Sequence, residues 1–236
     1  MALPKLETQT YTLTLPSTGK KLKFRPFLMK EQKVLMIAQE SEEDEQMQEA
    51  IANVVRACTF EKIDPWTCPA FDLEYIFIKL RGKSVGESVE LNVLCPDDNE
   101  TRATIKVQLD EVECMMHVGH SNEVSITDEI KLIMKYPTLK DLSVVQKEKS
   151  TETEKVFKML HTCIQQIIDG DTIHQDIDIP DEELTEFLDT LTAHQLEGIS
   201  NFFETMPKLS HTIKVKNPKT KKTGEVVIEG FENFFE

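Results

Sequence analysis

The sequence predicts an α+β fold in which antiparallel β-hairpins pack with amphipathic helices. Two patterns indicate these elements. In several short runs apolar and polar residues alternate on either side of a polar turn, which is typical of hairpins. In other stretches apolar residues recur every three to four positions, which is typical of helices. The hairpins and helices follow one another without strand–helix–strand crossovers, and this order favours α+β over α/β.

The three expected hairpins share this alternation and pair 11–15 with 22–24, 85–93 with 103–109, and 212–216 with 225–229. Pro26 ends the first one, because proline cannot donate to a strand ladder. The turn of the third carries Lys219, Lys221 and Lys222. In an acidic protein we interpret such a turn as a soluble tip or as a contact to an acidic protein patch.

The expected helices have apolar residues at helical spacing and cover residues 29–39, 47–58, 69–82, 151–169, 181–191 and 192–206. The third is apolar on most sides, so we expect it to be buried on most sides. Capping boxes, Thr151 with Glu154 and Thr192 with Gln195, start two of the others. The acidic run 40–46 is interpreted as a solvated loop or a first helical turn.

Two stretches remain open. Residues 110–123 fit no single element. Between residues 130 and 136 the alternation favours a strand, although Ile130, Ile133 and Met134 would equally suit a short helix. The polar stretch 147–152 is the expected boundary between two parts of the chain. We therefore expect a hairpin-and-helix domain at 1–146, rich in strands, and a mostly helical region at 153–236 that ends in a hairpin and an aromatic tail.

Composition restricts the classes of function. A chain of 236 residues, 39% apolar and 29% charged, can bury a core as one large domain or two small ones. The net charge of −15 argues against binding to nucleic acid or to an anionic membrane and suits either solubility or a basic protein partner. No apolar run is long enough for a transmembrane helix, and no signal-peptide pattern is present, so we expect the protein in the cytosol. Five widely spaced cysteines fit free thiols.

Neither a metal site nor a catalytic site is expected. The cysteines lack CxxC spacing, and Cys95 beside Pro96 resembles half of a zinc knuckle. Cys114 lies near the HxxH pair formed by His117 and His120. We interpret Cys114 as an ordinary thiol and the two histidines as ordinary side chains that bind no metal. The acidic clusters lack EF-hand spacing, and no nucleophile or phosphate-binding motif occurs. We therefore expect no cofactor, no small-molecule substrate and no enzymatic activity.

Apolar side chains near the ends of elements are the candidate partner-binding residues. Phe27 and Leu28 follow Pro26, and a helix cannot bury two adjacent phenylalanines on one narrow face. An exposed aromatic tail would be sticky, so it packs on the core or on a partner. The alternative for every candidate is plain core packing. The candidates are Phe27, Leu28, Phe202, Phe203, Met206, Phe231, Phe234 and Phe235.

Several segments resemble the baseplate hub protein family of T4-like tailed phages. The resemblance is carried by KKLKFRPFLMKEQKVLMIA (Lys20–Ala38), by VVRACTF at the end of the second helix, by FDLEYIFIKLRGKSVGE (Phe71–Glu87), and by IKLIMKYPTLKDL (Ile130–Leu142). None is a catalytic signature, and their order along the chain matters more than any single segment. The last 90 residues resemble the family only in being helical, acidic and of similar length.

The resemblance implies a non-enzymatic protein, made in the cytoplasm of an infected bacterium, that helps to build the hub at the centre of the tail baseplate. Its partners would be other hub proteins or the tape-measure protein. Two alternatives stay open: a transient chaperone of the tape-measure protein that is absent from the virion, and a hub-associated cell-wall hydrolase. A hydrolase needs a placed pair of carboxylates or a metal in a cleft, and the sequence marks neither.

Overall fold

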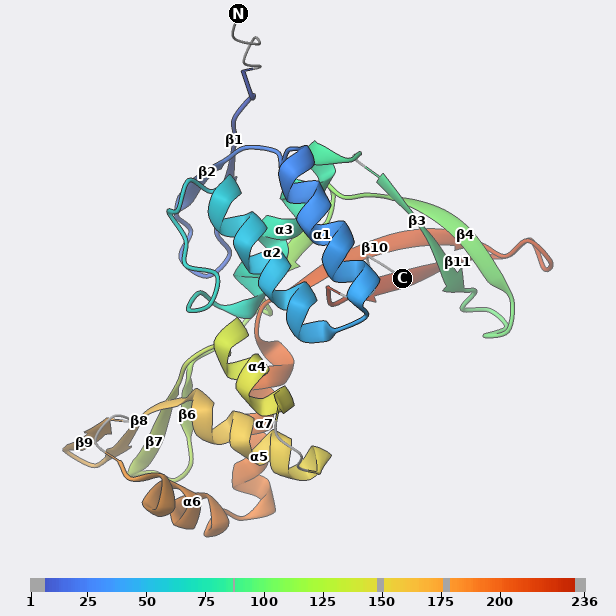
Figure 1. The fold of residues 1–236 in the computed structure, drawn as a ribbon. Helices are drawn as coiled ribbons and strands as arrows, with labels where there is room; N and C mark the ends of the chain where they lie inside the picture. Colours follow the sequence, from blue (N-terminus) through green and yellow to red (C-terminus); the bar gives the residue numbers. More distant parts are fainter. Residues whose placement is uncertain (1–6, 87, 148–150, 176–178, 232–236) are drawn as a thin grey trace, which may run out of the picture. The chain divides into compact units, whose positions relative to one another are not determined.

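The structure, a computed structural model, describes residues 7–86, 88–147, 151–175 and 179–231 (Figure 1). It has the predicted α+β fold, built from helices and small antiparallel sheets. Contacts divide the chain into two compact units. The first comprises Met1–Met115 and Pro207–Glu236, and the second comprises Met116–Met206.

These units differ from the expected division at 147–152. The last hairpin belongs to the first unit because β10 (Lys208–Lys216) pairs with β5 (Glu113–Met115), placing Leu209 opposite Cys114. Pairing between strands so far apart in sequence leaves no local signal. Residues 148–150 of the expected boundary lie outside the described residues.

The first unit combines three helices with three small sheets. The sheets are β1–β2, β3–β4 and β11–β10–β5, all antiparallel. The three expected hairpins are thus confirmed, and the undecided stretch contributes β5. The remaining elements are β1 (Tyr11–Thr14), β2 (Lys21–Phe24), α1 (Met29–Ser41), α2 (Asp44–Cys58), α3 (Ala70–Ser84), β3 (Ser88–Leu94), β4 (Arg102–Gln108) and β11 (Thr223–Glu229).

Helix α3 is central to the first unit, as its apolar sequence predicts. Ile76, Ile78 and Leu80 are fully buried. Ile78 belongs to a core with residues of β3, β4 and β10. Gly82 does not end the helix, which continues to Ser84; a Cβ at Gly82 would lie 3.4 Å from the Leu109 side chain. The missing side chain lets the helix approach the chain after β4 closely.

The second unit packs helices on a four-stranded antiparallel sheet of order β6–β7–β8–β9. Its core includes Leu132 of β7, Ile164 of β8, and Ile199 and Phe202 of α7. The elements are β6 (Glu123–Ser125), β7 (Ile130–Met134), α4 (Leu139–Lys147), α5 (Glu152–Cys163), β8 (Ile164–Asp169), β9 (Thr172–Gln175), α6 (Asp181–Asp189) and α7 (Ala193–Thr205).

The prediction of one helix over 151–169 is wrong for residues 164–169. Helix α5 ends at Cys163, and the next residues form strand β8. The IQQII sequence is rich in β-branched residues, which pack well in strands. Gly170 adopts a positive φ of 54° and turns the chain into β9. The C-terminal region therefore contains a sheet as well as helices.

Candidate protein-binding surfaces

Helix α1 begins at a buried ion pair. The Glu31 carboxylate lies 2.8 Å from Arg25 Nη2, and its second oxygen accepts a hydrogen bond of 2.8 Å from the Leu28 backbone N–H. Burial alone would raise the pKa of Glu31, but the bonds from Arg25 and Leu28 outweigh it and lower the pKa. This carboxylate therefore caps the helix and fixes where it starts.

The side of α1 that faces solvent is unusually apolar. The helix buries only Glu31 and Ala38. Val34 and Ile37 are 44% and 54% exposed, and they share one side because residues three apart are neighbours on a helix. Val34 and Ile37 together are called the outer face of α1 below.

A groove of about 510 Å³ runs along the adjacent side of α1. Its walls come from α1, α2, α3 and Phe231, which lies two residues after β11, and we call it the α1–α2 groove. The Phe231 ring contacts the Phe77 ring edge-on, with centroids 5.7 Å apart. The groove is lined by Phe27, Gln32, Leu35, Met36, Gln39, Asp44, Met47, Ile51, Phe77, Arg81, Val85 and Phe231.

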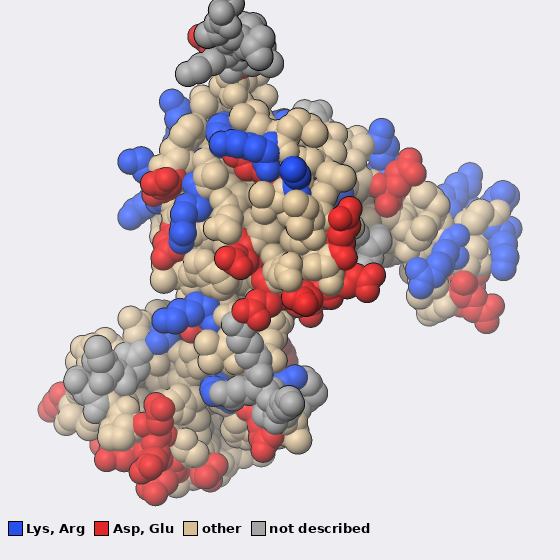
Figure 2. All heavy atoms as spheres, viewed as in Figure 1, with Lys and Arg blue, Asp and Glu red and all other residues tan. Residues whose placement is uncertain are grey.

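Charge is distributed unevenly over the first unit (Figure 2). Acidic side chains gather at the turn between α1 and α2, where Glu40, Glu42, Glu43, Asp44 and Glu45 are exposed. Asp44 also lines the α1–α2 groove. One end of the groove is therefore acidic, while its walls are mostly apolar.

The basic turn of the third hairpin is held against the turn of the second. Asn217, 1% exposed, donates from its amide to Asp97 at 2.8 Å and to Asp98 at 2.9 Å. Thr220 donates its hydroxyl proton to Asp97 as well. These bonds lower the pKa of the Asp97 carboxyl. The pKa of the Asp98 carboxyl is lowered chiefly by hydrogen bonds from Thr101 and from the Glu100 backbone, with a smaller effect of Asn217. Lys219, Lys221 and Lys222 therefore lie on a turn whose position is fixed by the hydrogen bonds from Asn217 and Thr220.

Three predicted partner-binding residues lie at the α1–α2 groove or beside it. Phe27 is buried in its wall, Phe231 is half-buried there, and Leu28 is exposed just before α1. Phe234 and Phe235 lie outside the described residues. Sequence reasoning missed Ile37, although five consecutive apolar residues at 34–38 cannot all face one side of a helix.

The three candidates around α7 lie together in the second unit. Phe202 is 1% exposed and belongs to the core. Phe203 packs on it with ring centroids 5.1 Å apart, and it is half-buried, as is Met206. Phe202 is therefore a packing residue in the isolated chain, whereas Phe203 and Met206 keep some exposed surface.

His120 is fixed by hydrogen bonds at both ring nitrogens. Thr205 donates its proton to the Asn201 carbonyl at 2.6 Å, so its oxygen accepts from His120 Nδ1 at 2.9 Å. His120 Nε2 then accepts from the Tyr136 hydroxyl at 2.9 Å. The neutral ring, which packs at a tilt of 33° against the Phe202 ring, thus satisfies both hydrogen-bond partners. Neither nitrogen is left to bind a metal.

The second unit is expected to lose stability as the pH falls below about 6.5. Burial, with a smaller effect of His117, lowers the pKa of His120 from its ordinary 6.5. The unfolded chain therefore takes up a proton at a pH where the folded chain does not, which favours unfolding. Urea unfolding of the second unit at pH 7.5 and pH 5.5 measures this decrease in the free energy of unfolding. The decrease should be smaller in the His120→Asn variant. An equal loss in the His120→Asn variant would contradict this assignment.

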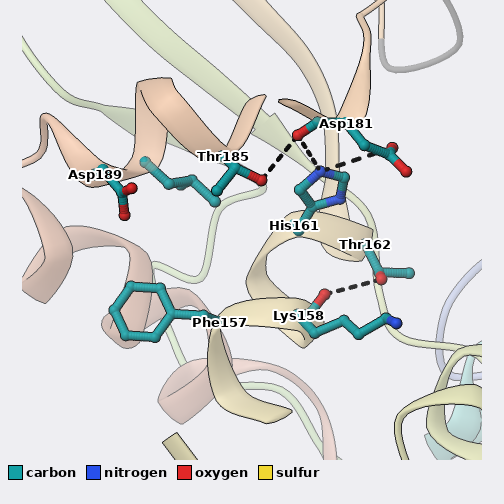
Figure 3. A pocket seen from close by; sticks show the side chains of 8 residues that line it. Phe157, Lys158, His161, Thr162, Asp181, Thr185 and Asp189 are labelled. Atoms are coloured by element: carbon teal, nitrogen blue, oxygen red, sulfur yellow. Dashed lines mark hydrogen bonds and ion pairs between the residues drawn. The ribbon is translucent and has the colours of Figure 1, made fainter. Parts of the chain in front are cut away.

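A second hollow lies between α5 and α6 (Figure 3). His161 Nε2 lies 3.8 Å from the Asp181 carboxylate and 3.4 Å from its backbone carbonyl. Thr185 donates to that same carbonyl at 2.8 Å, and Thr162 donates to the Lys158 carbonyl at 2.9 Å. Both hydroxyls are thus bonded to helix carbonyls, and the histidine activates neither. This arrangement joins two helices rather than preparing a nucleophile.

Among the residues that the structure describes, no group of three histidine, cysteine or acidic side chains could hold a metal ion. Burial raises the pKa of the Cys114 thiol to about 12, which disfavours the thiolate that a metal would require. In the same described part of the chain, no helix has the length and apolar character to cross a bilayer.

Comparison with family models identifies the protein family. The model described as T4 bacteriophage base plate protein matches residues 8–236. The comparisons with curated proteins and with solved structures gave no match. The matched range extends far beyond the four segments that carry the resemblance in sequence and includes the third hairpin. The chain therefore belongs to the T4 bacteriophage base plate protein family.

Proposed function

We propose that this phage base plate protein is a non-enzymatic component of the baseplate hub, made in the host cytoplasm and built into the tail through protein contacts. The family implies assembly with other phage proteins. The apolar outer face of α1 is the observation that supports this mode of action. Direct partners would be other hub proteins or the tape-measure protein.

The outer face is suited to a protein contact because it lies on a rigid, capped helix. Val34 and Ile37 are each about half exposed. Covering the rest of such side chains stabilises a complex by roughly 1 kcal/mol each, since full burial contributes about 1.5–3 kcal/mol. Lys30 and Lys33, both exposed on the same helix, would flank the contact and favour a partner with acidic groups at its rim.

The variant Ile37→Glu tests this proposal. We expect the number of infectious particles to fall at least about 100-fold, because a buried unpaired carboxylate in the contact costs several kcal/mol. The melting temperature should change by less than about 2 °C, because position 37 is exposed. Infected cells that depend on the supplied variant provide the readout, and thermal unfolding of the purified chain provides the stability measurement.

Val227→Glu is the matched control, because Val227 is 53% exposed in the same unit but lies on β11. It should leave particle numbers near those of the unchanged protein. Normal assembly with Ile37→Glu would show that the outer face does not contact a partner. Loss of particles with both variants would indicate a general effect of added charge.

A transient assembly chaperone is the alternative within the same family. It would also need an apolar contact surface, so the Ile37→Glu variant cannot separate it from a hub subunit. The two differ in whether the protein is present in finished particles.

A further inference from the structure

The α1–α2 groove leads to an assignment for the segment that follows it in sequence. Phe231, the last described residue, lines the groove and contacts Phe77. Residues 232–236, with the sequence ENFFE, come next and lie outside the described residues. We propose that this segment docks into the α1–α2 groove of its own chain, with Phe234 and Phe235 as the side chains that fill it.

The length of the chain limits where these phenylalanines can lie. An extended chain spans at most about 3.6 Å per residue, so the Phe234 Cα lies within about 11 Å of the Phe231 Cα. Phe235 lies within about 14 Å. The groove is therefore within reach of both side chains.

The groove offers the surface that two phenylalanines require. Its walls include aromatic rings at Phe27 and Phe77 and two methionines, Met36 and Met47. Methionine adapts its shape to fill gaps and contacts aromatic rings favourably. Exposed adjacent phenylalanines would add to an apolar patch of the kind that drives association, whereas docking removes both apolar surfaces from water.

Charge favours the same occupant. Burial in the groove wall lowers the pKa of Arg81, because the protein removes water from its guanidinium. The segment carries carboxylates at Glu232 and Glu236. A carboxylate placed near Arg81 offsets the cost of that desolvation. The apolar centre of the segment thus matches the apolar walls of the groove, and a carboxylate of the segment matches the side of the groove that carries Arg81.

The two sides of α1 would then have different roles. The docked segment covers the groove side, represented by Met36, while the outer face with Val34 and Ile37 stays open. Docking of the segment involves contacts within one chain only and is therefore independent of the proposed function.

Site-specific photo-cross-linking of the full chain tests the proposal. Phe234→p-benzoylphenylalanine introduces a probe of similar shape that links to nearby C–H groups on illumination. We expect cross-links to groove residues, chiefly Met36 and Met47, within single chains. Mixing chains of two isotopic compositions before illumination distinguishes links within a chain from links between copies. The same probe at Phe60, which is exposed and does not line the groove, should give no link to Met36 or Met47.

Two neighbouring substitutions form a matched pair in the presence of that probe. Met36→Glu places a carboxylate in the groove, and Ile37→Glu places one on the outer face at nearly equal exposure, 51% against 54%. We expect Met36→Glu to reduce the cross-link yield several-fold and Ile37→Glu to leave it unchanged. In parallel, Phe234→Ser with Phe235→Ser should lower the melting temperature of the first unit by roughly 5 °C or more.

Three results would overturn the proposal. Links confined to surfaces outside the groove would place the segment elsewhere. Links only between copies would make a second chain the occupant. Equal yields from the Met36→Glu and Ile37→Glu chains, with an unchanged melting temperature in the double serine variant, would mean that the phenylalanines do not pack in the groove.

Discussion

Phe202→Ala is expected to destabilise the second unit by roughly 3–5 kcal/mol, the usual cost of removing a fully buried ring. The Phe202 ring lies 5.3 Å from His120, 5.6 Å from Tyr136 and 5.1 Å from Phe203, measured between centroids. A cavity at this point would leave those rings without a packing partner. Because folded domains are stable by only about 5–15 kcal/mol, a large share of the second unit's stability would be lost.

Phe203→Ala is the matched comparison, one residue along the same helix. Its ring is half-buried, so we expect less than half the loss seen with Phe202→Ala. Hydrogen exchange of peptides from residues 116–206 reports this unit separately from the first. Equal losses for the two variants would mean that both rings are core residues.

Glu31→Ala is expected to destabilise the first unit by roughly 3–5 kcal/mol, because removing one member of a buried ion pair leaves the other charge uncompensated. Arg25 would lose its partner at 2.8 Å, and the Leu28 N–H would lose its acceptor. The start of α1 would then fray. Since both the outer face and the groove depend on this helix, assembly should fail as well.

Glu31→Gln separates the charge from the hydrogen bonds. The amide can still accept from Leu28 but no longer carries the charge that balances Arg25, so we expect an intermediate loss. Fluorescence of Trp66, the only tryptophan, reports urea unfolding of the first unit. Stability unchanged in Glu31→Ala would show that the ion pair does not fix α1.

Local patterns were sufficient for most of the fold. The alternation at 11–24, 85–109 and 212–229 predicts three hairpins, and all three form. Strand β5 could not be predicted, because three residues carry too little pattern and their partner, β10, comes about 90 residues later in the chain. The helix predicted over 151–169 fails after Cys163, where pairing with β7 and β9 outweighs helical spacing.

The candidate surfaces were less predictable, because exposure depends on tertiary packing. Phe27 and Phe231 were chosen as residues near the ends of elements, and the structure brings both to one groove. Phe202 was chosen for the same reason, but the structure shows that it is a core residue. Ile37 could have been found from the apolar run at 34–38, since one helix face cannot hold all five residues. The ion pair between Arg25 and Glu31 had no distinctive sequence pattern.

Quantitative mass spectrometry of purified particles against infected-cell lysate tests the central proposal most directly. A hub component should be present at a fixed, small number of copies per particle, in constant ratio to other tail proteins. Abundance in the lysate with absence from the particles would contradict a structural role, and it would assign this base plate family member to transient assembly instead.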